Sequence, residues 1–125
     1  MQKEKVLTQI SEDSLPLREP TFFILLSLAP GKKHGYAILK DVEAMSGGKL
    51  QLSTGTLYGA LSRMLTQDLV EFASPDDGEQ QPPSPGKPRK AYRLTSSGRK
   101  LLQAEQLRLQ SLLTVANRYL GDPGI

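Results

Sequence analysis

Apolar residues recur at three- and four-residue intervals in three stretches of the chain, which predicts three helices. The first, residues 19–28, is apolar almost all round, which is typical of a helix at the centre of a core. The second, 35–46, is amphipathic and is followed by Gly47, a residue that favours the positive φ found after many helices. The third, 54–68, follows Ser53, a natural N-cap. We therefore expect a small, mainly helical core.

Shorter runs in which polar and apolar residues alternate predict three strands, at 49–52, 69–73 and 91–94. The segment of about 74–90 between the last two strands holds five prolines and two glycines. Prolines and glycines at this density favour an extended hairpin loop.

A long last helix, predicted for residues 96–120 with Thr95 as its cap, has more apolar surface than one intramolecular contact can cover. A helix that is apolar on two faces at the end of so short a chain predicts a partner, most simply a second copy of the chain. The residues expected in that interface are Leu102, Leu109, Leu112, Leu113, Ala116, Tyr119 and Leu120.

The predicted order is helix, helix, strand, helix, strand, long loop, strand, helix, which is the winged helix-turn-helix arrangement. The fold class is α+β, mostly α. The domain plan is an arm or short helix at 1–17, a winged helix at 18–95 with its wing at about 74–90, and a dimerisation helix at 96–121. In this fold the third helix enters a DNA major groove and the wing reaches the neighbouring backbone or minor groove.

Charge is unevenly distributed along the chain, whose formal net charge is +3. Residues 82–104 carry six cations and no acid, directly after an acidic stretch at 75–81. Such a basic segment is typical of a protein that binds a polyanion, and equally of a solvated loop. Lys32 and Lys33 have the same two interpretations, a contact to the DNA backbone or an ordinary exposed turn.

Several classes of protein are excluded by residue types that the sequence lacks. Without cysteine there is no disulfide and no thiolate site, and the single His34 suggests neither a metal site nor a catalytic triad. No Walker, GxGxxG or GxSxG motif occurs. We expect a protein that is not an enzyme and needs no cofactor or metal. Neither a membrane span nor a signal peptide is evident, so a cytoplasmic location is expected.

The polar face of the third predicted helix carries small hydroxyl residues and two glycines. Each glycine costs about 1 kcal/mol relative to alanine inside a helix. Close approach to a DNA backbone would offset this cost, and so would close packing against a neighbouring helix. Tyr58 is either a phosphate or base contact or a half-buried tyrosine. The predicted DNA-binding residues are Ser53, Thr54, Gly55, Thr56, Tyr58, Gly59, Ser62 and Arg63 on the helix, and Lys87, Arg89 and Lys90 on the wing.

The region from Phe22 to Leu102 resembles the PadR-like transcriptional regulators. The matching pieces, which cover about two thirds of the chain in the expected order, are Ile24–Leu28, His34-Gly35-Tyr36, Ser53-Thr54-Gly55-Thr56-Leu57-Tyr58, Leu61, Arg63 and the run from Lys90 to Gly98. With one helix after the wing, the chain is similar to the shorter subfamily. The resemblance implies a homodimeric DNA-binding regulator, commonly a repressor, sometimes released by a small aromatic ligand.

Two other functions stay open for the same fold. One is a protein-interaction module. The other is a small-molecule sensor with weak DNA binding, in which Phe22, Phe23 and Tyr36 line a pocket with the last helix. Tyr36 and Tyr92 are expected to be core or dimer-pocket aromatics. For the regulator itself, a palindromic operator is expected, because two equivalent helices would enter successive grooves.

Overall fold

The computed structural model describes residues 15–73 and 90–124, and these fall into two compact units. One unit is Arg18–Arg99; the described residues of the other are 15–17 and 100–124. The elements are α2 (Glu19–Ser27), β1 (Lys33–His34), α3 (Gly35–Met45), α4 (Thr54–Thr66), β2 (Val70–Phe72), β3 (Ala91–Leu94) and α5 (Ser96–Leu120). Among the described helices, none combines the length and apolar character needed to cross a membrane.

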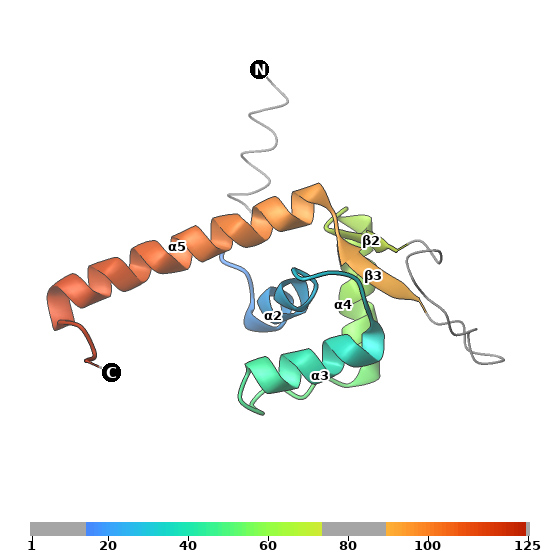
Figure 1. Cartoon of the computed structure of the whole chain (residues 1–125), viewed down its shortest axis with the longest axis horizontal. Helices are drawn as coiled ribbons and strands as arrows, with labels where there is room; N and C mark the ends of the chain where they lie inside the picture. The colour runs from blue at the N-terminus through green and yellow to red at the C-terminus, as the bar shows by residue number, and fades with distance from the viewer. Residues whose placement is uncertain (1–14, 74–89, 125) are drawn as a thin grey trace, which may run out of the picture. The chain divides into compact units, whose positions relative to one another are not determined.

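Helix α2 supplies the centre of the 18–99 core, as its apolar sequence predicts. Pro20 lies in its first turn, where no intrahelical N–H is lost. Ile24 and Leu25 are fully buried, and α2 packs mainly against α3 (Figure 1).

Helix α3 buries one face through Gly35, Ile38 and Val42, at three- and four-residue spacing. Of the two positions expected for Tyr36, the one in the core is wrong, since its side chain is 69% exposed, and the one in a dimer pocket stays a prediction. At about 100° per residue, Tyr36 points roughly 160° away from Ile38 and roughly 120° away from Val42, so its side chain leaves the buried face. Met45, at the end of the helix, is also exposed.

Helix α4 begins where the sequence predicts, because the Ser53 hydroxyl accepts the Thr56 backbone N–H at 3.1 Å. Its stripe of Leu57, Ala60, Leu61 and Met64 is buried. The helix packs against α3 and β2, which Figure 1 shows beside it. A tight turn follows α4. The α3–α4 pair and the adjoining sheet form the winged helix-turn-helix that the sequence predicts.

The sheet has the order β1-β3-β2 and is antiparallel throughout. The predicted strands before and after the long loop are confirmed, but the predicted strand at 49–52 is wrong. In that segment the Leu50 N–H donates to the Ser46 hydroxyl at 2.9 Å, which makes it part of the turn that ends α3. The third strand is instead Lys33–His34, which pairs with Tyr92 and Ala91.

The start of α5 is held tightly against the turn between α4 and β2. The Thr95 hydroxyl accepts the Gly98 N–H at 2.9 Å, which confirms the predicted cap, and donates to the Asp68 carbonyl at 2.6 Å. A Cβ placed on Gly98 would lie 2.0 Å from the Leu69 carbonyl oxygen. Only glycine therefore fits at this point in the first turn of α5.

Glu105, in the unit that contains most of α5, is a buried carboxylate that the sequence analysis missed. Its side chain is 2% exposed. It accepts two hydrogen bonds from the Arg108 guanidinium, at 2.5 and 2.9 Å, and one from the Leu17 N–H at 3.1 Å. The Arg108 hydrogen bond is the main cause of a lowered Glu105 pKa, and burial opposes it. The carboxylate thus ties residue 17 to α5.

Replacing Glu105 with glutamine is expected to lower the free energy of unfolding at pH 7 by about 2 kcal/mol, because charged hydrogen bonds are lost. Since the folded-state pKa of Glu105 is lowered, its contribution is present above its ordinary pKa of 4.5 and is lost as the pH falls through the lowered value. Thermal unfolding between pH 7 and pH 3 should show the difference between wild type and Glu105→Gln shrinking. The control is Glu43→Gln, at an exposed position of α3. Equal stability of Glu105→Gln and wild type at pH 7 would contradict the prediction.

Candidate nucleic-acid interface

The outer face of α4 is polar and built from small residues, opposite its buried stripe. Its exposed side chains are those of Thr54, Thr56, Tyr58, Ser62, Arg63 and Thr66, with the N-cap Ser53 at one end. Because the residues between them fill the core, this face is fixed in place while its side chains stay accessible. All of the predicted DNA-binding residues of the helix therefore belong to one surface.

The two glycines of α4 are not explained by packing within the described chain. A Cβ on Gly55 would come no closer than 4.0 Å to the Ser53 hydroxyl, and one on Gly59 would lie 3.7 Å from the Arg63 guanidinium. Both are ordinary contacts, so alanine fits at either position. Close packing against a neighbouring helix of the same chain, one of the two explanations for these glycines, is thus not supported by the described residues.

Tyr58 connects α4 to the beginning of α3. Its side chain is 48% exposed, and its hydroxyl occupies the space above Gly35, where a Cβ would lie 2.3 Å from that oxygen. Tyr92 on β3 is buried as expected; burial raises its pKa, and the neighbouring Tyr58 raises it further. The Tyr58 ring therefore belongs to a contact between the two helices, with one side open to solvent.

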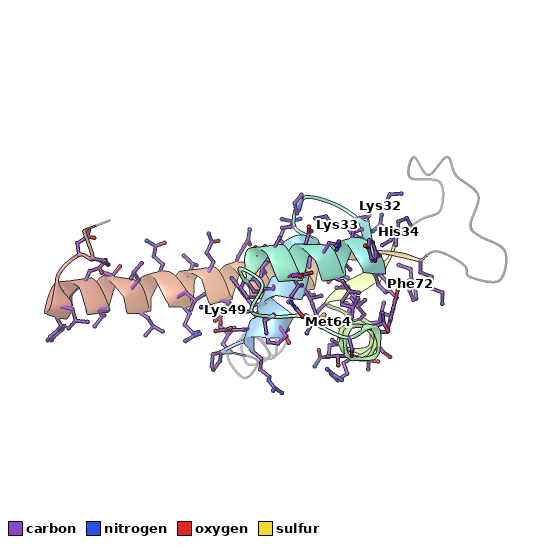
Figure 2. All side chains as sticks on the ribbon, turned by 90° about the horizontal axis from the view of Figure 1, so that it is seen from below. Lys32, Lys33, His34, Lys49, Met64 and Phe72 are labelled. Atoms are coloured by element: carbon purple, nitrogen blue, oxygen red, sulfur yellow. The ribbon has the colours of Figure 1, made fainter. Side chains whose placement is uncertain are left out.

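Only the base of the predicted wing is described. Lys90 is exposed, with its ammonium 5.1 Å from the centre of the Phe72 ring, which lies 5.3 Å from the Tyr92 ring. Phe72 and Lys33 pair with Tyr92 from opposite sides of β3, and Figure 2 labels Phe72 and His34 toward the same end of α3. Lys87, Arg89 and the rest of the segment 74–89 lie outside the described residues. Lys90 thus places one cation of the basic segment beside the sheet.

The sequence of residues 24–104 matches the family described as "Transcriptional regulator PadR-like family". This match covers well over half of the chain. The chain belongs to the PadR-like family of transcriptional regulators.

Solved structures share the fold of this PadR-like protein. A PadR family transcription regulator from Clostridium difficile R20291 is 26% identical, with a TM-score of 0.61 over 83% of this chain and 100% of that one. Bacillus subtilis PadR in complex with operator DNA is 23% identical, with a TM-score of 0.54 over 69% of this chain and 45% of that one.

A longer protein also shares part of this PadR-like sequence. An uncharacterized 37.1 kDa protein in transposon TN4556 of Streptomyces fradiae is 39% identical over 82 residues, which is 66% of this chain. The PadR-like chain spans about a fifth of that relative's length, 20%.

The C-terminal helix of the PadR-like protein exposes most of the residues predicted to bind a second copy. Leu112 and Leu113 are 55% and 56% exposed, and Tyr119 and Leu120 are more exposed still. The exposed members of the predicted set are Leu109, Leu112, Leu113, Ala116, Tyr119 and Leu120. Leu102 differs, because it is already buried in the single chain. The distal part of α5 is therefore an apolar surface that no described residue covers.

The three aromatics predicted for a ligand pocket lie in different surroundings. Phe22 and Phe23 are partly buried on α2 and meet edge to face with their ring centres 5.9 Å apart. Tyr36 lies on the exposed side of α3, with the Lys40 ammonium 5.6 Å from its ring centre. Their assignment to one pocket stays a prediction.

Proposed function

We propose that this PadR-like protein is a homodimeric, sequence-specific DNA-binding regulator that acts as a repressor and is released by a small aromatic ligand. The observation that carries the DNA-binding part is the outer face of α4. It is exposed, rich in hydroxyls and contains two glycines for which the described chain supplies no steric reason. The two glycines lower the stability of the helix and allow no closer packing within the described chain. Their lack of a side chain is suited to close approach by another molecule.

In the proposed complex, α4 enters the major groove from its N-terminal end. Ser53, Thr54 and Thr56 lie there, where backbone N–H groups and hydroxyls favour phosphate oxygens. Arg63, more than two turns further on, contacts the DNA backbone. Tyr58 contributes mainly by fixing α4 against Gly35. Lys90 and the rest of the basic wing add salt-dependent affinity.

A second copy of the chain covers the exposed apolar part of α5 in this proposal. Two α4 helices related by a two-fold axis then enter successive major grooves, about 34–36 Å apart. This geometry requires a palindromic site and makes dimerisation a condition for tight binding.

Selection of the full-length protein on random DNA, followed by fluorescence anisotropy on the selected site, tests the proposal. We expect a palindrome with half-sites one helical turn apart. If about 8 phosphates are neutralised per dimer, the slope of log affinity against log salt is about −7. Failure to select any sequence, together with the absence of salt-dependent binding, would contradict a DNA-binding function. Adding planar aromatic compounds to the complex then tests ligand release.

Replacing Gly59 with alanine is expected to change protein stability and operator affinity in opposite directions. The added methyl fits without a clash, so the free energy of unfolding should rise by up to about 1 kcal/mol. Operator affinity should fall roughly tenfold or more, because the methyl holds the helix away from the DNA; tenfold corresponds to about 1.4 kcal/mol. Thermal unfolding and anisotropy measure the two effects. Gln103→Ala on exposed α5 is the control, and unchanged affinity of Gly59→Ala would refute this role for the glycine.

A further inference from the structure

Two adjacent lysines just before α3 differ in what their ammonium groups contact. The Lys33 ammonium forms an ion pair with the Asp41 carboxylate, two turns along α3. The Lys32 ammonium is buried, and within the part of the chain that the structure describes it has no hydrogen-bond partner. The two lysines look equivalent in the sequence, but only Lys33 has a partner for its charge among the described residues.

This difference affects what each lysine gains from an anion. An ammonium group has three N–H donors, and a buried polar group without a partner is unfavourable. Because lysine has a flexible four-carbon stem, the Lys32 ammonium can turn outward to a phosphate oxygen, which supplies the missing acceptor. Lys33 would first have to give up Asp41, so a phosphate there replaces one ion pair by another. A phosphate should therefore bind Lys32 more favourably than Lys33.

Lys32 lies close in the sequence to the point where α3 and α4 meet. Lys32 directly precedes β1, which is an edge strand of the sheet, and lies three residues before Gly35. Gly35 is the residue that the Tyr58 hydroxyl of α4 covers. Figure 2 shows Lys32, Lys33 and His34 together at the N-terminal end of α3. In a helix-turn-helix, the helix before the recognition helix crosses the DNA backbone.

We propose that Lys32, and not Lys33, binds a phosphate of the DNA backbone next to the groove that α4 enters. The inference rests on the proposed DNA-binding function and adds a specific contact to it. Lys33 has a structural role, in which it holds the start of α3 through Asp41. The Lys32 contact is independent of base sequence, because it is made to the backbone.

The matched variants Lys32→Ala and Lys33→Ala test the proposal, since each removes one positive charge at neighbouring positions. Operator affinity is measured by anisotropy over a series of salt concentrations, with a non-specific duplex alongside. For Lys32→Ala we expect a slope of log affinity against log salt that is shallower by about 2 per dimer. Affinity should fall roughly tenfold on both duplexes, while the melting temperature stays near that of wild type.

For Lys33→Ala we expect an almost unchanged slope and a lower melting temperature. Lys32→Gln keeps the length of the side chain without its charge and repeats the test if alanine disturbs the fold; Lys32→Arg should retain the wild-type slope. A wild-type protein without salt-dependent binding would refute the proposed function itself. Salt-dependent wild-type binding with an unchanged slope in Lys32→Ala, or with equal changes in both alanine variants, would refute the assignment to Lys32 alone.

Discussion

Replacing Leu112 and Leu113 with glutamate is expected to give a monomer whose operator affinity is at least roughly 100-fold weaker than that of wild type. Both side chains are more than half exposed in the single chain, so the change should leave the fold of the protomer intact. In a dimer held by α5 they would be buried, and an unpaired carboxylate in an apolar interface costs several kcal/mol. A monomer presents one α4 instead of two, which removes half of the contacts to the operator.

Light scattering measures the mass of this variant, and anisotropy measures its binding. The matched control is Ser111→Glu with Thr114→Glu, which adds the same charge on the side of α5 turned away from the leucines. We expect the control to remain a dimer and to bind DNA more tightly than the leucine variant. If the Leu112 and Leu113 variant remains a dimer, the interface lies elsewhere.

Replacing Gly98 with alanine is expected to destabilise the protein by about 3 kcal/mol, the upper part of the range for overpacked sites. The added Cβ would lie 2.0 Å from the Leu69 carbonyl oxygen, and a backbone atom cannot rotate away as a side chain can. The turn that would have to move also holds the Thr95 cap. The melting temperature should fall by roughly 10 °C or more.

The same substitution at Gly59 is the internal control, because a Cβ there meets no atom closer than 3.7 Å. Thermal unfolding of Gly98→Ala and Gly59→Ala under identical conditions should give changes of opposite sign. A Gly98→Ala variant within about 1 kcal/mol of wild type would show that the junction of β3 and α5 adapts to the extra methyl.

The helices could be predicted from the sequence because each carries its own signal within a few residues. The repeat of Leu57, Leu61 and Met64 and the Ser53 cap are local, and so are the hydroxyls on the opposite face of α4. Strand β1 could not be predicted in this way. A two-residue strand shows no alternation, and its partner β3 lies on the far side of two helices and the long loop.

The contacts that the sequence did not reveal join residues distant along the chain. The fit of the Tyr58 hydroxyl over Gly35 depends on how α3 and α4 cross, which periodicity does not specify. Glu105 offered a partial signal, because it is the acidic residue three positions after Leu102 on a stripe that is otherwise apolar. Its burial becomes evident only once the Leu17 N–H, which is distant along the chain, is found beside it.

The open space above Gly55 and Gly59 has a consequence for how this regulator can change over time. Larger side chains at these two positions would enter solvent and leave the core of the winged helix undisturbed. In the proposed complex the same side chains would hold α4 away from the DNA, so single substitutions here can weaken operator binding without any loss in the stability of the protomer. A selection for stable variants that have lost operator binding is therefore expected to return substitutions at these two positions.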